Sequence, residues 1–250
     1  MSRNLQNEHA ESLRQKGGVS QARPHCGGSG EKRAIDTGRI RLVEELGVSC
    51  ETMARLDAVV TLLDRWNRAI NLVSTQSLPH LWTRHILDSA QLLRFVPSAA
   101  QDWRDIGSGG GFPGLVVAIL AQEKSPSLRV TLVESDKRKA AFLETAARAL
   151  DLDIDILSAR EENLPESPCD VVSARAVAPL TTLVGWAHRH LQPKGLALFP
   201  KGAGHAAELD AALASWHFRV QKHHSLSGNG AILGIDRIYP RKTGGSAADR

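Results

Sequence analysis

The sequence lacks any apolar run long enough to cross a membrane. No stretch reaches the roughly 18 residues that a spanning helix needs, and the polar N-terminus lacks the apolar segment of a signal peptide. Cysteine is scarce too. Cys26, Cys50 and Cys169 are far apart and odd in number, which fits a reducing compartment and excludes a disulfide framework. We therefore expect a cytoplasmic protein.

Metal-ligand spacings and a large charge excess are also missing. His188/His190 and His223/His224 are close pairs, but no further Cys or His set accompanies them, so we expect no metal site. The net charge of +4 arises in residues 1–41, which hold eight Lys or Arg against four Asp or Glu, whereas the remainder is balanced. Any nucleic-acid-binding surface must therefore rest on local basic clusters.

The 250 residues leave room for one or two domains, and composition divides them into four segments. Residues 1–40 are rich in Gly, Ser, Gln and charge without periodicity, and we expect a flexible basic extension. Order is expected to begin near Val43, within a helical region over 41–98. An α/β domain follows over 99–242, and residues 243–250 are expected to form a flexible tail.

Two helices are expected in the helical region. Apolar residues recur at helical spacing from Met53 to Ile70, with Ser49 as a suitable N-cap. A second helix is expected from Leu78 to Phe95, with Ser77 as its cap and Pro79 in its first turn.

Strand-like and helix-like segments alternate in the α/β domain. Five expected strands, each followed by a turn or a helix, read "WRDIG", "RVTLVES", "DIDILSA", "CDVVSARA" and "GLALFPKG". Two more, "RVQKHHSL" and "AILGIDRIYP", have little between them, as in a hairpin. This order predicts an α/β, Rossmann-like parallel sheet, covered on both faces, with a closing antiparallel hairpin.

The stretch "RDIGSGGGFPGL", residues 104–115, holds five glycines in the expected turn between the first strand and its helix. Such a turn lies at the carboxyl edge of a doubly wound sheet, where ligands bind. Gly107, Gly109 and Gly111 are expected to adopt positive φ, and Gly114 to let the helix pack closely on the strand. A nucleotide-hydrolase phosphate loop is excluded, because no Lys-Ser/Thr pair follows the last glycine.

Two cofactor classes fit this turn. "GGGFPG" (109–114) matches the dinucleotide pattern, with Glu134 as the later acid, and Glu134 can bind ribose hydroxyls in either class. Asp105 favours S-adenosylmethionine, because a carboxylate this close would repel a pyrophosphate. It can orient the turn, and it can meet the cationic end of the cofactor directly or through water. A turn that serves packing alone is the remaining interpretation.

Five segments form a recognisable set. They read "WNRAINLVS" (66–74), "RHILDS" (84–89), "DIGSGGGFPG" (105–114), "ESDKRKAAFL" (134–143) and "SARAVAPL" (173–180). In order and spacing they resemble the bacterial small-subunit ribosomal RNA guanine-N7 methyltransferases, also called glucose-inhibited division protein B, from about Val43 to Pro240. The N-terminal extension has no counterpart in this family; it is either an unselected or mis-started terminus or a basic arm that holds RNA.

The resemblance implies a methyltransferase that uses S-adenosyl-L-methionine to modify 16S ribosomal RNA. It places cofactor contacts on Gly107 and Phe112, on Arg160 and Glu161 beside the adenine, and on Arg175. Together with the residue-based reasoning, the expected cofactor-binding set is Gly107, Gly109, Phe112, Glu134, Arg160, Glu161 and Arg175. Arg175 can meet either the cofactor carboxylate or a target phosphate. We expect a monomer.

Methylation of guanine N7, the reaction of this family, agrees with the lack of an acid–base motif in the sequence. N7 of guanine has a free lone pair and no proton, so alignment replaces a general base, and the sequence has no obvious acid–base motif. "SARAVAPL" stands where exocyclic-amine methyltransferases often carry an Asn/Asp-Pro-Pro-aromatic loop. Cys169 follows a proline, as a cytosine-methylating nucleophile would, but it precedes its strand, so we expect a structural role at the far edge of the sheet.

A second set of residues could act on the guanine or grip RNA. The catalytic residue is unknown, and the candidates are Asp88, Arg84, His85 and Lys201. Asp88 could stabilise the cationic product or pair with Arg84 four residues earlier. Phosphate contacts could come from Arg84, His85, Lys137–Lys139, Lys201, Arg237 and Arg241. Trp82 could stack on a base, but a core position is favoured.

Two other functions remain open at this point. One is an NAD-dependent oxidoreductase on a similar sheet, which Asp105 and the closing hairpin disfavour. The other is a non-catalytic RNA-binding module that has kept the fold.

Overall fold

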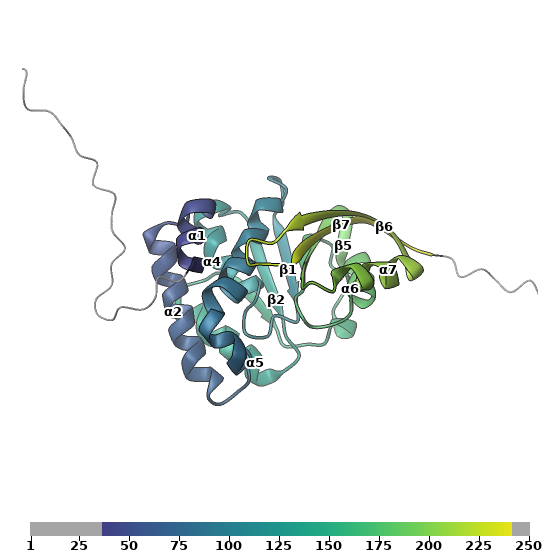
Figure 1. Ribbon diagram of the computed structural model, residues 1–250. Helices are drawn as coiled ribbons and strands as arrows, with labels where there is room; N and C mark the ends of the chain where they lie inside the picture. The colour runs from purple at the N-terminus through teal and green to yellow at the C-terminus, as the bar shows by residue number, and fades with distance from the viewer. Residues whose placement is uncertain (1–36, 242–250) are drawn as a thin grey trace, which may run out of the picture. The chain divides into compact units, whose positions relative to one another are not determined.

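A seven-stranded sheet organises residues 37–241, the part of the chain that the computed structural model describes (Figure 1). The order is β3-β2-β1-β4-β5-β7-β6. All pairs from β3 to β5 are parallel, whereas β7 runs antiparallel to both neighbours. The predicted α/β sheet with a closing hairpin is confirmed. The strands are β1 (Asp102–Ile106), β2 (Arg129–Val133), β3 (Ile154–Leu157), β4 (Cys169–Ser173), β5 (Leu191–Lys201), β6 (Trp216–His224) and β7 (Ala231–Pro240).

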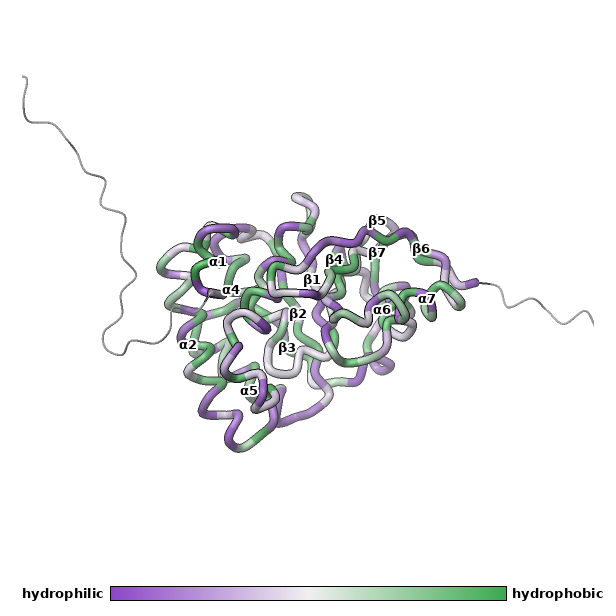
Figure 2. The backbone as a smooth tube through the Cα atoms, viewed as in Figure 1, coloured by the Kyte–Doolittle hydropathy of each residue, from purple (hydrophilic) through white to green (hydrophobic). Residues whose placement is uncertain are grey.

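Helices cover the sheet from two sides and enclose two separate hydrophobic clusters. They are α4 (Gly114–Lys124), α5 (Lys137–Ala149), α6 (Leu180–His190) and α7 (His205–Ser215). Alternate side chains of a strand point to opposite faces, so Val171 of β4 packs in the cluster with α4 and α5, and Val172 in the cluster with α6 and α7. In Figure 2, hydrophobic and hydrophilic residues alternate along the helices α2 (Cys50–Asn67) and α5.

Two helices precede the sheet. In α2 (Cys50–Asn67) the predicted cap is confirmed, because the Ser49 hydroxyl accepts from the Thr52 N–H at 3.1 Å. The preceding α1 (Thr37–Leu46) begins before Val43, so the expected start of order was too late. The cysteine expectation also needs correction, because Cys50 is disulfide-bonded, although Cys169 is free and buried. The extension up to residue 36 and the tail from residue 242 lie outside the described residues.

The second predicted helix is irregular rather than a single α-helix. It consists of the 3₁₀ segment η1 (Thr75–His80), the π-helical turn η2 (Trp82–Leu87), the short α3 (Asp88–Ala90) and the 3₁₀ segment η3 (Gln91–Phe95). Ser77 and Pro79 lie inside η1 rather than at a cap and a first turn. Wide π turns are frequent at functional sites, and this one presents the Arg84 carbonyl to a side chain from another element.

The connection from β3 to β4 contains only a short 3₁₀ turn, η4 (Glu161–Asn163). Each of the other connections between parallel strands contains an α-helix: α4 between β1 and β2, α5 between β2 and β3, and α6 between β4 and β5. Because β1 lies between β2 and β4, the chain leaves β1 and β4 in opposite directions across the sheet, which creates a ligand-binding crevice at their carboxyl ends. No described helix is both long and apolar enough to span a bilayer.

Candidate active site

The glycine turn lies at the carboxyl end of β1, as predicted, and three of its glycines have positive φ. These angles are +73° at Gly107, +55° at Gly109 and +89° at Gly111. A Cβ on Gly109 would find only the Gly107 carbonyl oxygen within 4 Å, at 3.8 Å, so the backbone there faces open space. A Cβ on Gly107 would lie 2.5 Å from Cγ2 of Val177. The turn is therefore packed against the loop after β4 at one glycine and open at another.

Most N–H groups of the turn donate to acceptors within the protein. Gly107 and Ser108 both donate to the Val133 carbonyl, at 2.9 and 3.0 Å, and Gly111 and Phe112 donate to the Ser108 carbonyl, at 2.8 and 3.1 Å. A phosphate-binding loop instead presents free N–H groups to its anion. This turn therefore does not form a pyrophosphate cradle, despite its match to the dinucleotide pattern.

Asp105 lies beneath the turn and is fully buried. Oδ2 accepts the Gly114 N–H at 3.0 Å, and Oδ1 accepts the Ser173 hydroxyl at 2.6 Å. Burial raises the pKa of this carboxyl, and the hydrogen bonds from Ser173 and Gly114 oppose the rise. Asp105 orients the turn, as predicted, but its oxygens are enclosed by protein. Contact with the cationic end of the cofactor, directly or through water, stays a prediction.

Glu134 joins the end of β2 to the glycine turn. Its carboxylate accepts the Gly109 N–H through Oε2 at 2.8 Å and the Asp136 N–H through Oε1 at 2.7 Å. The side chain is nearly buried. Each carboxylate oxygen keeps a second lone pair, so these bonds fix the carboxylate while leaving it able to accept from a ligand hydroxyl.

Arg175 brings the loop after β4 onto the irregular helix. Its guanidinium donates to the Arg84 carbonyl at 2.8 Å and to Nδ1 of His85 at 2.6 Å, and it lies 3.4 Å from Oδ2 of Asp88. It also lies 5.3 Å from the ring centroid of Phe112. The sequence offered two roles for Asp88, stabilising the cationic product or pairing with Arg84; the observed cation partner of Asp88 is Arg175, in the loop after β4.

His85 has a specific tautomer in this cluster. Because a guanidinium can only donate, Nδ1 of His85 accepts from Arg175 and the proton resides on Nε2. The Nε2 atom is buried and has no hydrogen-bond partner in the protein. Burial, with the positive charges of Arg175 and Arg84, lowers the pKa of His85 to about 3. His85 is therefore a neutral donor rather than a cation, and its contact with a phosphate stays a prediction.

Comparison with known proteins now decides the family. The model of the family described as "rRNA small subunit methyltransferase G" matches residues 52–232. A ribosomal RNA small subunit methyltransferase G from Ruegeria sp. (strain TM1040) is 50% identical over 198 residues, covering 78% of this chain and 96% of the relative. One from Cereibacter sphaeroides is 48% identical over 192 residues, covering 77% of this chain and 93% of that protein. The chain belongs to the rRNA small subunit methyltransferase G family.

Among solved structures, the fold is that of a methyltransferase. A crystal structure from Klebsiella pneumoniae, provisionally described as an O-methyltransferase, has a TM-score of 0.54 at 17% identity, covering 80% of this chain and 95% of that chain. Members of such a methyltransferase family use S-adenosylmethionine, so the cofactor predicted for the glycine turn is the one that the family match supports.

The remaining predicted residues of this methyltransferase lie in different settings. Arg160 is exposed, whereas the Glu161 side chain points inward and is 4% exposed. Lys201 is held by Glu208 at 2.7 Å, with the Ala178 carbonyl at 3.5 Å. Trp82 belongs to the core, with the Arg39 guanidinium 4.3 Å from its ring. Phe112 is buried rather than presented as an open surface, and its ring lies 4.9 Å from that of His85.

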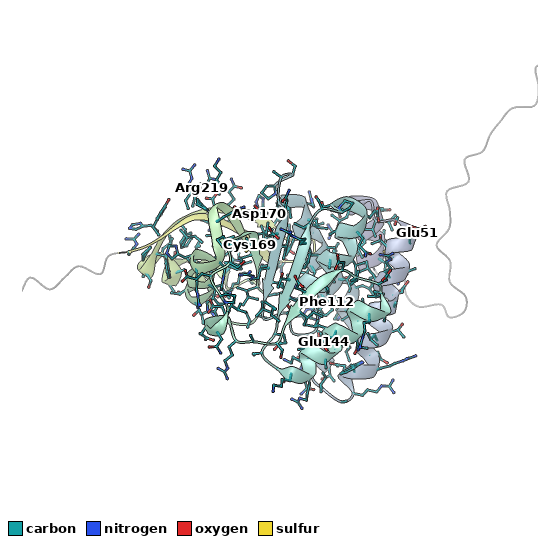
Figure 3. All side chains as sticks on the ribbon, turned by 180° about the vertical axis from the view of Figure 1, so that it is seen from behind. Glu51, Phe112, Glu144, Cys169, Asp170 and Arg219 are labelled. Carbon is teal, nitrogen blue, oxygen red and sulfur yellow. The ribbon has the colours of Figure 1, made fainter. Side chains whose placement is uncertain are left out.

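Cys169 lies at the edge of the sheet opposite the turn, as predicted. It begins β4, and the adjacent Asp170 accepts the N–H groups of Gln101 and Asp102 at the start of β1. Figure 3 shows Cys169 and Phe112 in separate parts of the domain. Burial raises the pKa of the Cys169 thiol to about 11, so it is not poised to act as a nucleophile.

Sequence reasoning missed three residues of this region. Ser173 at the end of β4 links that strand to β1, because its hydroxyl donates to Asp105 and accepts from Nε1 of Trp103 at 2.8 Å. Ser225 and Ser227, in the turn between β6 and β7, both donate to Oδ1 of Asp88, at 3.1 and 2.7 Å. Ser173 stood within the quoted "SARAVAPL" segment, but the two hairpin serines carried no local signal, because only the fold brings them to Asp88.

Proposed function

We propose that this protein transfers the methyl group of S-adenosylmethionine to N7 of a guanine in 16S ribosomal RNA. The observation that carries this proposal is the glycine turn. Its backbone is open at Gly109 while most of its N–H groups donate within the protein, in a chain of the rRNA small subunit methyltransferase G family. Such a surface suits a cofactor with no phosphate at this position.

The chemistry requires alignment more than proton transfer. The N7 lone pair attacks the methyl carbon, the carbon–sulfur bond breaks with its electrons remaining on sulfur, and S-adenosylhomocysteine leaves. No proton has to be removed from N7, so the protein must hold nucleophile, methyl and sulfur in line and exclude water, which can contribute up to roughly 10 kcal/mol. This agrees with a site whose ionisable groups are mostly paired with one another.

The cofactor would be held at the carboxyl edge of the sheet. Gly107 and Gly109 would provide the surface beneath it, and Glu134 would accept from the ribose hydroxyls through its remaining lone pairs. The Arg160–Glu161 segment would meet the adenine with backbone groups, because the Glu161 carboxylate faces the other way. Phe112 and Arg175 would close the methionine end, where their stacked arrangement joins the turn to the irregular helix.

The target base would lie beside the π turn. A buried donor without an acceptor is costly to the folded protein, and we place the Nε2–H of His85 opposite an acceptor of the bound substrate. Asp88 would stabilise the cationic methylated ring through the same cluster, and exposed Arg84 would contact a phosphate. Lys201 would act through Glu208 and the Ala178 carbonyl, by shaping the loop after β4.

RNA outside the reacting base would be gripped by exposed basic residues. Lys137 and Arg138 at the start of α5, and Arg237 and Arg241 at the end of β7, are exposed. Each alone is a modest contact, and their sum sets the salt dependence of binding. We propose that the protein acts as a monomer on the small ribosomal subunit or on its RNA.

Two measurements test the proposal. S-adenosylhomocysteine is expected to raise the melting temperature and NADH to leave it unchanged; stabilisation by NADH alone would overturn the cofactor assignment. Small ribosomal subunits from cells without this gene, incubated with labelled S-adenosylmethionine, are expected to gain N7-methylguanosine. Cofactor binding without transfer of label to RNA would show a binding module instead.

A further inference from the structure

A buried polar cluster lies under the segment that we propose to meet adenine. It consists of Arg104 in β1, Arg189 and His190 at the end of α6, and Glu161 in η4. His190 is fully buried, and Arg104 and Glu161 are 8% and 6% exposed. None of these side chains reaches the reacting atoms in the proposed function, so their burial requires another explanation.

The hydrogen bonds of the cluster form a chain of donors and acceptors from Arg104 through His190 to Glu161. Arg104 Nη1 lies 2.9 Å from Nδ1 of His190, and Nε2 of His190 lies 3.0 Å from Oε1 of Glu161. Because arginine can only donate, Nδ1 of His190 accepts and its Nε2–H donates to the carboxylate. A neutral imidazole thus bridges a guanidinium and a carboxylate, and burial with two nearby arginines lowers the pKa of His190 to about 4, which keeps it neutral.

Arg189 binds the backbone of the same segment. Its Nη2 lies 2.9 Å from the Leu164 carbonyl oxygen and 3.3 Å from that of Glu162, and its Nη1 lies 3.5 Å from Oε1 of Glu161. The connection that it holds has no α-helix of its own, only the three residues of η4. Side-chain bonds from the end of α6 therefore provide the anchoring that a packed crossover helix would otherwise give.

We propose that His190, with Arg104 behind it, is a positioning residue for adenine recognition. By fixing the Glu161 carboxylate inside the protein, it sets where the Arg160–Glu161 backbone stands at the edge of the cofactor site. The inference rests on the proposed function, because it requires S-adenosylmethionine to bind at this edge. The inference predicts selectivity for adenine, because adenine presents its N1 as an acceptor and its amino group as a donor to the backbone.

Two substitutions separate positioning from stability. His190→Gln keeps a donor and an acceptor on one side chain, whereas His190→Leu keeps the volume and removes both. The control is His188→Leu on the same helix, since His188 bonds the Ile238 carbonyl at 3.1 Å and packs on Trp216, toward the hairpin and not toward Glu161. All variants are the full chain, assayed well below their melting temperatures.

The expected result is a loss of affinity confined to one variant. His190→Leu should weaken S-adenosylhomocysteine binding by about tenfold or more, as displaced contacts do, raise KM for the cofactor, and change kcat at saturating cofactor little. It should also reduce discrimination between S-adenosylhomocysteine and its inosine analogue, which inverts the hydrogen-bonding pattern of the base. His190→Gln should retain most of the affinity and discrimination, and His188→Leu should retain both.

Other outcomes overturn the inference. Unchanged affinity and discrimination in His190→Leu would mean that the cluster only stabilises the fold. If His190→Leu does not fold, an Arg189→Leu variant decides in the same way, because it leaves the bond between His190 and Glu161 in place and releases the backbone carbonyls of Glu162 and Leu164. Failure of the unaltered protein to bind S-adenosylhomocysteine would instead reject the proposed function, which the melting-temperature test detects separately.

Discussion

Substitution of Gly109 by alanine tests where the cofactor lies. The backbone at Gly109 is left-handed, with φ of +55°, and an added Cβ would meet only a carbonyl oxygen at 3.8 Å. The folding cost is therefore conformational, about 1–2 kcal/mol for an L-residue. For a domain of this size it corresponds to a fall in melting temperature of roughly 2–8 °C.

The effect on cofactor binding is expected to exceed the effect on stability. The new methyl group would occupy the open space against which the cofactor is proposed to lie, and overpacking of this kind costs about 1–3 kcal/mol. Titration calorimetry should then show a dissociation constant for S-adenosylhomocysteine raised about 5- to 150-fold. Unaltered affinity in a folded Gly109→Ala protein would refute the placement of the ligand over this part of the turn.

Gly107→Ala provides the matched control. It has the same class of backbone conformation, with φ of +73°, but its Cβ would lie 2.5 Å from Cγ2 of Val177. It should lose more stability than Gly109→Ala, and a second substitution, Val177→Ala, should restore part of the loss. The same contact with Val177 makes a β-branched side chain at position 107 a larger defect, so Gly107→Val should be less stable than Gly107→Ala.

Three further predictions concern buried groups. His190 has a pKa of about 4 in the folded protein against about 6.5 in the unfolded chain, so the unfolded chain binds more protons between these pH values. Urea unfolding should therefore show a free energy of unfolding that falls by about 3 kcal/mol from pH 6.5 to pH 4. An equal fall in the His190→Gln variant would contradict this. Gly114→Ala should lower the urea midpoint of unfolding, because the added Cβ would lie 2.6 Å from the Cβ of Asp105. Overpacking of this kind costs about 1–3 kcal/mol. An unchanged midpoint would show that α4 can shift to make room. Arg175→Met should raise the pKa of His85, since a nearby cation is removed, and an NMR titration that still gives a value near 3 would assign the shift to burial and Arg84 without Arg175.

The sequence was sufficient to predict the sheet and the turn, because both depend on local patterns. Short apolar strands alternate with helical segments, and glycine at positions that need positive φ is a local requirement. The predicted carboxyl-edge placement of Gly107 and the far-edge placement of Cys169 followed from strand order. Nothing in those inferences required knowledge of side-chain partners.

Predictions of charge pairing were less successful, because partners are chosen by the fold. Spacing favoured Asp88 with Arg84, but the π turn and the loop after β4 brought Arg175 instead. The sequence left open whether Asp105 orients the turn or meets the cofactor, and it could not reveal that Ser173 and Gly114 both donate to its carboxylate. The orientation of the N–H groups in the turn, which disfavours a pyrophosphate more directly, depends on hydrogen bonds that no sequence pattern reveals.

The placement of β7 between β5 and β6 affects the order in which the sheet can be completed. β6 is synthesised before β7, but it pairs only with β7 in the described sheet, so it has no neighbour to join as it emerges. Until β7 inserts, β5 remains an open edge whose backbone groups can pair with another chain. Nascent or truncated chains that end before Ala231 are thus the forms of this protein most exposed to aggregation.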